Sequence, residues 1–248
     1  MKTRNLVHRW LGVGLAAAML LTGCSAAATS AANTVDAITA HTVEAAAPVD
    51  AATLAVAAPA VLASGLTEAE AADLRYMREE EKLAHDVYLT LYELWGQRIF
   101  QNIAASEQTH TDAVLQLLQS YGIADPVGAN PVGVFADPAL QTLYTELVAQ
   151  GRQSLSAALQ VGAAIEELDI LDLEAALAQT DKADIQTVYA NLRKGSSNHL
   201  RSFVQTLAQR SGETYTPQYL SQAAYDAIIG GAAGRGGSNQ GQRGNGRN

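Results

Sequence analysis

The chain has 248 residues, of which 25 are acidic and 16 basic, so its formal net charge is −9 at pH 7. This balance argues against a nucleic-acid-binding protein, because a phosphate backbone requires a basic surface. The single cysteine excludes a disulfide within the chain.

The first 24 residues have the features of a processing segment. A basic start with Lys2 and Arg4 precedes an apolar run over 11–22 that is too short to span a bilayer comfortably. Residues 21–24 read Leu-Thr-Gly-Cys and resemble the lipobox of bacterial lipoproteins. We therefore expect secretion across the inner membrane and a lipid anchor on Cys24 at the cell envelope. The alternative is an ordinary cleaved signal peptide with an incidental cysteine.

The foldable part of the chain is predicted to be residues 66–212. Residues 25–65 are rich in alanine and read as a tether, whereas the Gly-rich residues 230–248 cannot bury a core and are expected to be disordered. A short C-terminal helix fits within 213–229. Residues 66–212 contain 20 acidic and 10 basic side chains, a net charge of −10, which is compatible with cation handling.

Four helices are predicted in this domain. The first starts at Thr67, with Glu70 at capping-box spacing, and Gly122 ends the second. The third starts at Asp137-Pro138 and continues past Leu155, with a break at Gly151 left open. The predicted core stripes are, in chain order, Leu74, Met77, Glu81, Ala84, Tyr88, Leu91 and Trp95; Phe100, Ile103, Glu107, His110, Val114, Leu117 and Tyr121; Leu155, Leu159, Gly162, Glu166, Asp169 and Leu173; and Ile185, Val188, Leu192, Ser196, His199, Phe203 and Leu207.

The connections predict an all-α, ferritin-like four-helix bundle. Short loops near Gly96 and at 180–183 make helices one and two, and three and four, antiparallel neighbours. The loop over 122–136 could reach roughly 50 Å when extended, whereas a 22-residue helix is only about 33 Å long. One long crossover between helices two and three is the ferritin-like connectivity. A plain up-and-down bundle with a loose loop is the alternative.

Polar residues interrupt the apolar stripes at similar heights. Because a buried charge costs several kcal/mol unless it is paired, these breaks need a common explanation, and a bound divalent metal supplies one. Glu107 and His110 form a Glu-x-x-His pair on one helix face. The charge run at 79–81 is typical of a solvated face, and only Glu81 falls on the stripe. The predicted metal ligands are Glu81, Glu107, His110, Glu166, His199 and Asp169.

The same positions carry a resemblance to known proteins. Residues 81–88 and 107–110, and His199 with Phe203, resemble ligand helices of the rubrerythrins and related ferritin-like proteins. Over residues 66–207 the chain more closely resembles an uncharacterised ferritin-like family, domain of unknown function 2202. That similarity rests on residues 77–84 (MREEEKLA), 165–170 (IEELDI) and 197–201 (SNHLR).

This resemblance implies a di-iron type of ligand set, with one departure. A full set has four carboxylates and two histidines, but Ser196 stands where a glutamate would be expected. Asp169 or Glu167 could supply the missing carboxylate; otherwise the second metal is held weakly or only one binds. His85, one turn after Glu81, is more typical of a residue beside the ligands than of a ligand.

The functional prediction is an iron-binding redox or iron-handling lipoprotein, with one or two Fe ions and Mn as the alternative metal. A di-iron oxidase or peroxidase-like activity fits this site. Two other classes stay open: a non-catalytic single-metal binder, and a structural or interaction module on the cell envelope. Besides the metal and the membrane, a homodimer is compatible with the sequence.

Overall fold

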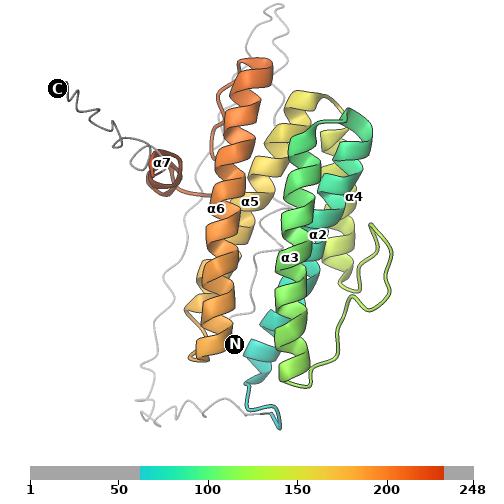
Figure 1. Cartoon of the computed structure of the whole chain (residues 1–248), viewed down its shortest axis with the longest axis vertical. Helices are drawn as coiled ribbons and strands as arrows, with labels where there is room; N and C mark the ends of the chain where they lie inside the picture. The colour runs from blue at the N-terminus through green and yellow to red at the C-terminus, as the bar shows by residue number, and fades with distance from the viewer. Residues whose placement is uncertain (1–61, 232–248) are drawn as a thin grey trace, which may run out of the picture.

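The computed structural model describes residues 62–231, which contain six helices and no strand. Four long helices lie side by side (Figure 1): α2 (Glu68–Trp95), α3 (Arg98–Ser120), α5 (Leu155–Leu177) and α6 (Ala183–Ser211). Two shorter helices are α4 (Pro138–Gly151) and α7 (Gln222–Gly230). The predicted all-α class is therefore confirmed.

The N-terminal predictions cannot be placed on this structure. The signal segment, Cys24 and the tether up to residue 61 lie outside the described residues, as does the tail from residue 232. Among the helices that are described, none combines the length and the apolar character needed to span a bilayer.

The long helices form two neighbouring pairs, α2 with α3 and α5 with α6, and α2 also contacts α5 while α3 contacts α6. Thr67 and Glu70 make the predicted capping box at the start of α2. Gly96 ends α2 with a φ of 61°, a left-handed conformation that favours glycine, so α3 can begin two residues later.

The third predicted helix is divided into α4 and α5. Gly151 ends α4 where the chain passes Leu91 so closely that a Cβ on residue 151 would lie 2.5 Å from the Leu91 Cδ2 atom. The Ser154 hydroxyl then accepts a hydrogen bond from the Ala157 N–H and starts α5. The connection between α3 and α5 therefore includes α4 as well as the loop, and it is longer than predicted.

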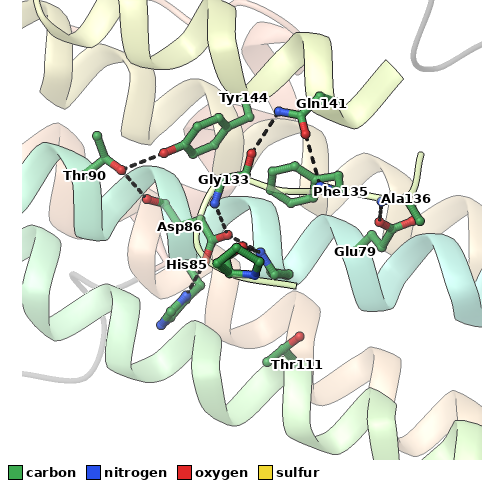
Figure 2. Close-up of polar contacts among 12 residues, drawn as sticks. Glu79, His85, Asp86, Thr90, Thr111, Gly133, Phe135, Ala136, Gln141 and Tyr144 are labelled. Carbon is green, nitrogen blue, oxygen red and sulfur yellow. Dashed lines mark hydrogen bonds and ion pairs between the residues drawn. The ribbon is translucent and has the colours of Figure 1, made fainter. Parts of the chain in front are cut away.

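The loop over 121–137, here the crossover loop, is tied to α2 by buried carboxylates (Figure 2). Asp86 accepts a 2.8 Å hydrogen bond from the Gly133 N–H, and Glu79 accepts a 2.5 Å bond from the Ala136 N–H. The expectation that residues 79–81 form a solvated face is wrong for Glu79. Only 5% of it is exposed, because its carboxylate takes the place of water for backbone N–H groups of the loop.

A second buried carboxylate holds the segment that leads to α7. Glu167 is fully buried and accepts hydrogen bonds from the backbone N–H groups of Gln218, Tyr219 and Leu220. α7 follows this segment and is seen end-on beside α6 (Figure 1). The carboxylate thus replaces solvent for three donors outside any regular element.

The core of the domain consists of two apolar clusters with a polar layer between them. Along α3, Phe100 and Ile103 belong to one cluster and Val114 and Leu117 to the other. Along α6, the order is reversed, because this helix runs in the opposite direction: Ile185, Tyr189 and Leu192 come first, then Leu200, Phe203 and Leu207. The predicted metal ligands occupy the layer between the clusters.

Candidate metal centre

Five of the six predicted ligands meet in this layer, and they come from all four long helices. α2 contributes Glu81, α3 contributes Glu107 and His110, α5 contributes Glu166, and α6 contributes His199. The three carboxylate side chains are 1–2% exposed and the two imidazoles 11–12%. Helical spacing places each side chain on the inner face of its helix, so the four helices converge on one point.

The candidate ligands form two groups that share Glu107. We call Glu81, Glu107 and His110 the Glu81 half, and Glu107, Glu166 and His199 the Glu166 half. In each half one ligand atom from every residue lies within 4.8 Å of the others. The two oxygens of Glu107 are divided between the halves: Oε2 lies 2.7 Å from His110 Nδ1, and Oε1 lies 2.8 Å from His199 Nδ1.

The geometry of the two groups is one that could hold a cation. Glu107 Oε1 and His199 Nδ1 are buried and close together, yet neither makes a hydrogen bond of acceptable geometry with any described residue. These two atoms therefore face each other without satisfying each other. Metal–ligand bonds of about 2.1 Å at right angles put neighbouring donors about 3 Å apart. His110 Nδ1 and Glu81 Oε2 are 3.3 Å apart, and His199 Nδ1 and Glu166 Oε2 are 3.5 Å apart.

The two imidazoles and their carboxylates perturb one another strongly. Burial would lower the pKa of His110, but hydrogen bonding to Glu107 and Glu81 outweighs it and raises the pKa to about 11. Burial would also lower the pKa of His199, but the charges and hydrogen bonds of Glu166 and Glu107 outweigh it and raise that pKa to about 10. Without a metal, both rings are therefore imidazolium cations at neutral pH, and a bound metal would displace one of their two ring protons.

The pKa values of Glu81 and Glu107 are shifted in opposite directions. Burial, reinforced by the charge of Glu107 and partly offset by hydrogen bonding to His110, raises the pKa of Glu81 to about 8. Burial also acts to raise the pKa of Glu107, but the two histidines overcome it and lower that pKa to about 2. The shared ligand therefore stays ionised, which suits a carboxylate that contacts both halves.

Asp169 lies near the ligands but outside both groups. Its Oδ2 atom accepts a hydrogen bond from the Ser196 hydroxyl, whereas Oδ1 has no hydrogen-bond partner among the described residues. Burial, together with the charges of Glu81 and Glu166, raises the pKa of Asp169 well above its usual range. An aspartate from α5 thus pairs with the serine that stands in the place of the expected glutamate on α6.

His85 is engaged elsewhere. Its Nδ1 atom lies 2.8 Å from Asp86 Oδ1, beside the crossover loop (Figure 2), and it belongs to neither half. Glu167, the other residue considered as a source of the missing carboxylate, is occupied by the backbone of residues 218–220.

Three contacts behind the ligands escaped the sequence reasoning. The Ser106 hydroxyl lies 3.0 Å from His199 Nε2, and the Tyr88 hydroxyl donates a 2.6 Å hydrogen bond to Glu166 Oε1. Gly195 lets His110 approach α6, since a Cβ there would lie 2.6 Å from the imidazole. Tyr88 was on the predicted stripe, and Ser106 precedes Glu107, but spacing alone does not show which atoms meet.

The chain is similar to known proteins of one family. A family model described as "Uncharacterized protein domain (DUF2202)" matches residues 70–232. A protein of Methanocaldococcus jannaschii described as "Uncharacterized protein MJ0754" is 53% identical over 171 residues, which are 69% of this chain and 92% of that protein. The solved structure of MJ0754 matches with a TM-score of 0.65 at 54% identity, covering 66% of this chain and 94% of the solved one. The residues that the family model matches include every residue of both halves.

Proposed function

Because the chain belongs to the family described as "Uncharacterized protein domain (DUF2202)", its function has to be inferred from its site, and we propose that it binds two divalent metal ions. The observation that carries the proposal is the division of Glu107 between two histidines, one from each half. Buried carboxylate oxygens and an imidazole nitrogen without hydrogen-bond partners support the proposal, because such unsatisfied polar atoms are costly unless a bound ion compensates.

The layout that we propose for the domain is that of a ferritin-like four-helix bundle. Helices α2, α3, α5 and α6 would be the four members, and the crossover loop with α4 would be the long connection between the second and the third. Two observations support this layout. The two core clusters follow each other in opposite order along α3 and α6, so these helices are antiparallel, and every long helix contributes a residue to the candidate metal-ligand layer.

The donor set favours iron, with manganese as the alternative, because carboxylate oxygens with imidazole nitrogens suit these ions. Bound iron would supply one-electron chemistry toward dioxygen or peroxide. The protein's own contribution is to hold the donors in place and keep bulk water away. The fully buried Tyr88 and Phe203, whose ring centroids are 5.1 Å apart, close the apolar side of the Glu166 half.

Asp169 is proposed to complete the Glu81 half. Both Asp169 Oδ1 and Glu81 Oε1 lack hydrogen-bond partners among the described residues, and the two carboxyls interact electrostatically. Asp169 would then compensate for Ser196. The second candidate function is the binding of a single metal without turnover, and the Ser196–Asp169 hydrogen bond favours it because it occupies one oxygen of that carboxylate.

Counting metal per chain tests the proposal. We expect the purified protein to retain about two Fe(II) per chain under anaerobic conditions and to accelerate the consumption of peroxide relative to free Fe(II). A chelator should lower its melting temperature, because a ligand at 100 times its Kd stabilises a folded protein by about 2.7 kcal/mol. One metal per chain without consumption of oxidant would select the single-metal function. No bound metal, and no effect of the chelator, would leave a structural or interaction role.

Metal loading should weaken as the pH falls from 9 to 6. The raised pKa values of His110, His199 and Glu81, to about 11, 10 and 8, mean that all three groups bind a proton at neutral pH when no metal is present. Each proton that the metal displaces makes the apparent affinity rise about tenfold per pH unit. Calorimetric titrations in buffers of different ionisation enthalpy should detect the released protons, and an affinity independent of pH would contradict this assignment.

The stability of the metal-free protein, unlike its metal affinity, should fall as the pH rises. Because the folded-state pKa of each histidine is raised, its stabilising contribution is complete below the unfolded value of about 6.5 and is lost as the pH rises through about 10 to 11. Low pH therefore weakens metal binding, whereas the ion pairs of the two histidines with Glu107 persist, because the pKa of Glu107 is lowered to about 2.

We propose further that the domain is displayed at the cell envelope. The support is in the sequence: a basic start, an apolar run and the Leu-Thr-Gly-Cys ending at Cys24, followed by an alanine-rich tether up to residue 65. Mass spectrometry of the protein from its native membrane tests this proposal, since lipidation would add a diacylglycerol group to Cys24.

A further inference from the structure

The two halves of the centre differ in the hydrogen bonds that their ligands receive from residues outside the ligand set. In the Glu166 half, the imidazole and one carboxylate each have a hydrogen-bond partner outside the ligand set. In the Glu81 half, the described residues provide no such partner for Glu81 Oε1 or for His110 Nε2. This asymmetry bears on the order in which metals bind.

Ser106 fixes the orientation of the His199 ring. The hydroxyl of Ser106 lies 3.0 Å from Nε2, and Nδ1 faces Glu107 and Glu166. When a metal displaces the Nδ1 proton, the Nε2–H that remains has the Ser106 hydroxyl as its acceptor, and the Nδ1 lone pair is directed at the Glu166 half. Nδ1 is the nitrogen that the Glu166 half needs as a ligand.

Tyr88 orients Glu166 in the same half. Its hydroxyl donates to Oε1 at 2.6 Å and so directs Oε2 toward His199 Nδ1. The tyrosine cannot easily move away, because it is fully buried and its ring packs on Phe203. The carboxylate is thereby held in a position suited to a metal before any metal arrives.

The Glu81 half has weaker supports. The Glu81 carboxylate contacts other members of the candidate ligand set, with His110 Nδ1 at 3.3 Å from its Oε2 atom, and its Oε1 atom has no hydrogen-bond partner among the described residues. The Cε1–Nε2 edge of the His110 ring lies against Gly195, where an added Cβ would be 2.6 Å from both ring atoms. Contact with a glycine restricts the position of the ring but gives it no hydrogen bond.

We infer that Ser106 and Tyr88 are positioning residues that preorganise the Glu166 half, so that the first divalent metal binds there and the second binds at the Glu81 half. The inference rests on the proposed two-metal function. Ligands already held in place lose less conformational freedom on binding, so the preorganised half should have the higher affinity. Removing a residue that supports a ligand in this way typically costs 10–100-fold in metal affinity.

Zn(II), which is diamagnetic, tests the order directly. In ¹⁵N NMR spectra of the full chain, one equivalent of Zn(II) should shift Nδ1 of His199, and the second equivalent should shift Nδ1 of His110. A shift of His110 first, or of both rings in parallel from the start, would overturn the inference. If neither ring shifts and no Zn(II) or Mn(II) binds, the two-metal proposal itself fails, and the inference fails with it.

Substitutions test the two positioning residues. In calorimetric titrations with Mn(II), Ser106→Ala and Tyr88→Phe should each weaken the tighter binding step by about 10–100-fold. Ser106→Thr should restore it, since threonine keeps the hydroxyl. Ser120→Ala and Tyr144→Phe are matched controls, because each removes a hydroxyl hydrogen bond to a residue that belongs to neither half. Unchanged affinity in both test variants, or equal weakening of both steps, would overturn the assignment.

Discussion

Replacing Glu107 by glutamine is expected to abolish stable metal binding in both halves, with a loss of affinity of more than about 100-fold at each. Other ligands serve one half only, whereas the two oxygens of Glu107 face His110 and His199. An amide keeps the shape of the side chain but offers one neutral oxygen in place of two charged ones. The loss of metal affinity in Glu107→Gln should therefore exceed the 10–100-fold loss that follows from removing a supporting residue.

The measurement is the number of Fe(II) or Mn(II) ions retained per chain, with circular dichroism to verify folding. Glu93→Gln is the matched control, because Glu93 is an exposed residue of α2 outside both halves. It should retain as much metal as the unaltered protein. A folded Glu107→Gln variant that kept two metals per chain would show that Glu107 is not the shared ligand.

Replacing Glu167 by alanine is expected to lower the free energy of unfolding by about 3–5 kcal/mol. This fully buried carboxylate accepts hydrogen bonds from three successive backbone N–H groups, at 3.1, 2.7 and 2.7 Å. Leaving a buried donor without an acceptor costs about 1–3 kcal/mol. The segment over 213–220 should also detach from α5 and become sensitive to proteases, while metal retention by the folded fraction stays near that of the unaltered protein.

Urea unfolding and limited proteolysis measure these effects. Glu174→Ala serves as the control, because Glu174 lies on the same helix but is about half exposed in an ion pair with Arg193, and such surface pairs contribute about 0–1 kcal/mol. Glu167→Gln should fall between the two, since one oxygen remains as an acceptor. A Glu167→Ala variant as stable as the Glu174→Ala variant would contradict the role given to this carboxylate.

The sequence predicted which acids and imidazoles lie together in the core, because helical periodicity is a local property. Glu107 and His110 share a face whatever the rest of the chain does, and the apolar stripes on both sides of them mark that face as the buried one. The same reasoning found Glu81, Glu166 and His199, which the structure brings together with them. The capping box at Thr67 is equally local, since both of its partners lie within four residues.

Periodicity failed where a side chain's partner lies far along the chain. The charge run at 79–81 has the pattern of a solvated face, yet Glu79 is buried because the crossover loop, more than fifty residues later, presents backbone N–H groups to it. The break at Gly151 could be suspected from the glycine, but its cause is a close contact with Leu91 on another helix.

What the sequence by itself determined is the all-helical class, the positions that face inward, and the set of acids and imidazoles that interrupt them. Only the tertiary structure decided that Glu107 faces both histidines, that Asp169 pairs with Ser196, and that Ser106 and Tyr88 support one half alone. The physical reason is that helix spacing fixes the direction of a side chain from its own axis. Which atoms meet at 3 Å depends on how separate helices are rotated and shifted against one another, and that is settled by packing of the whole core.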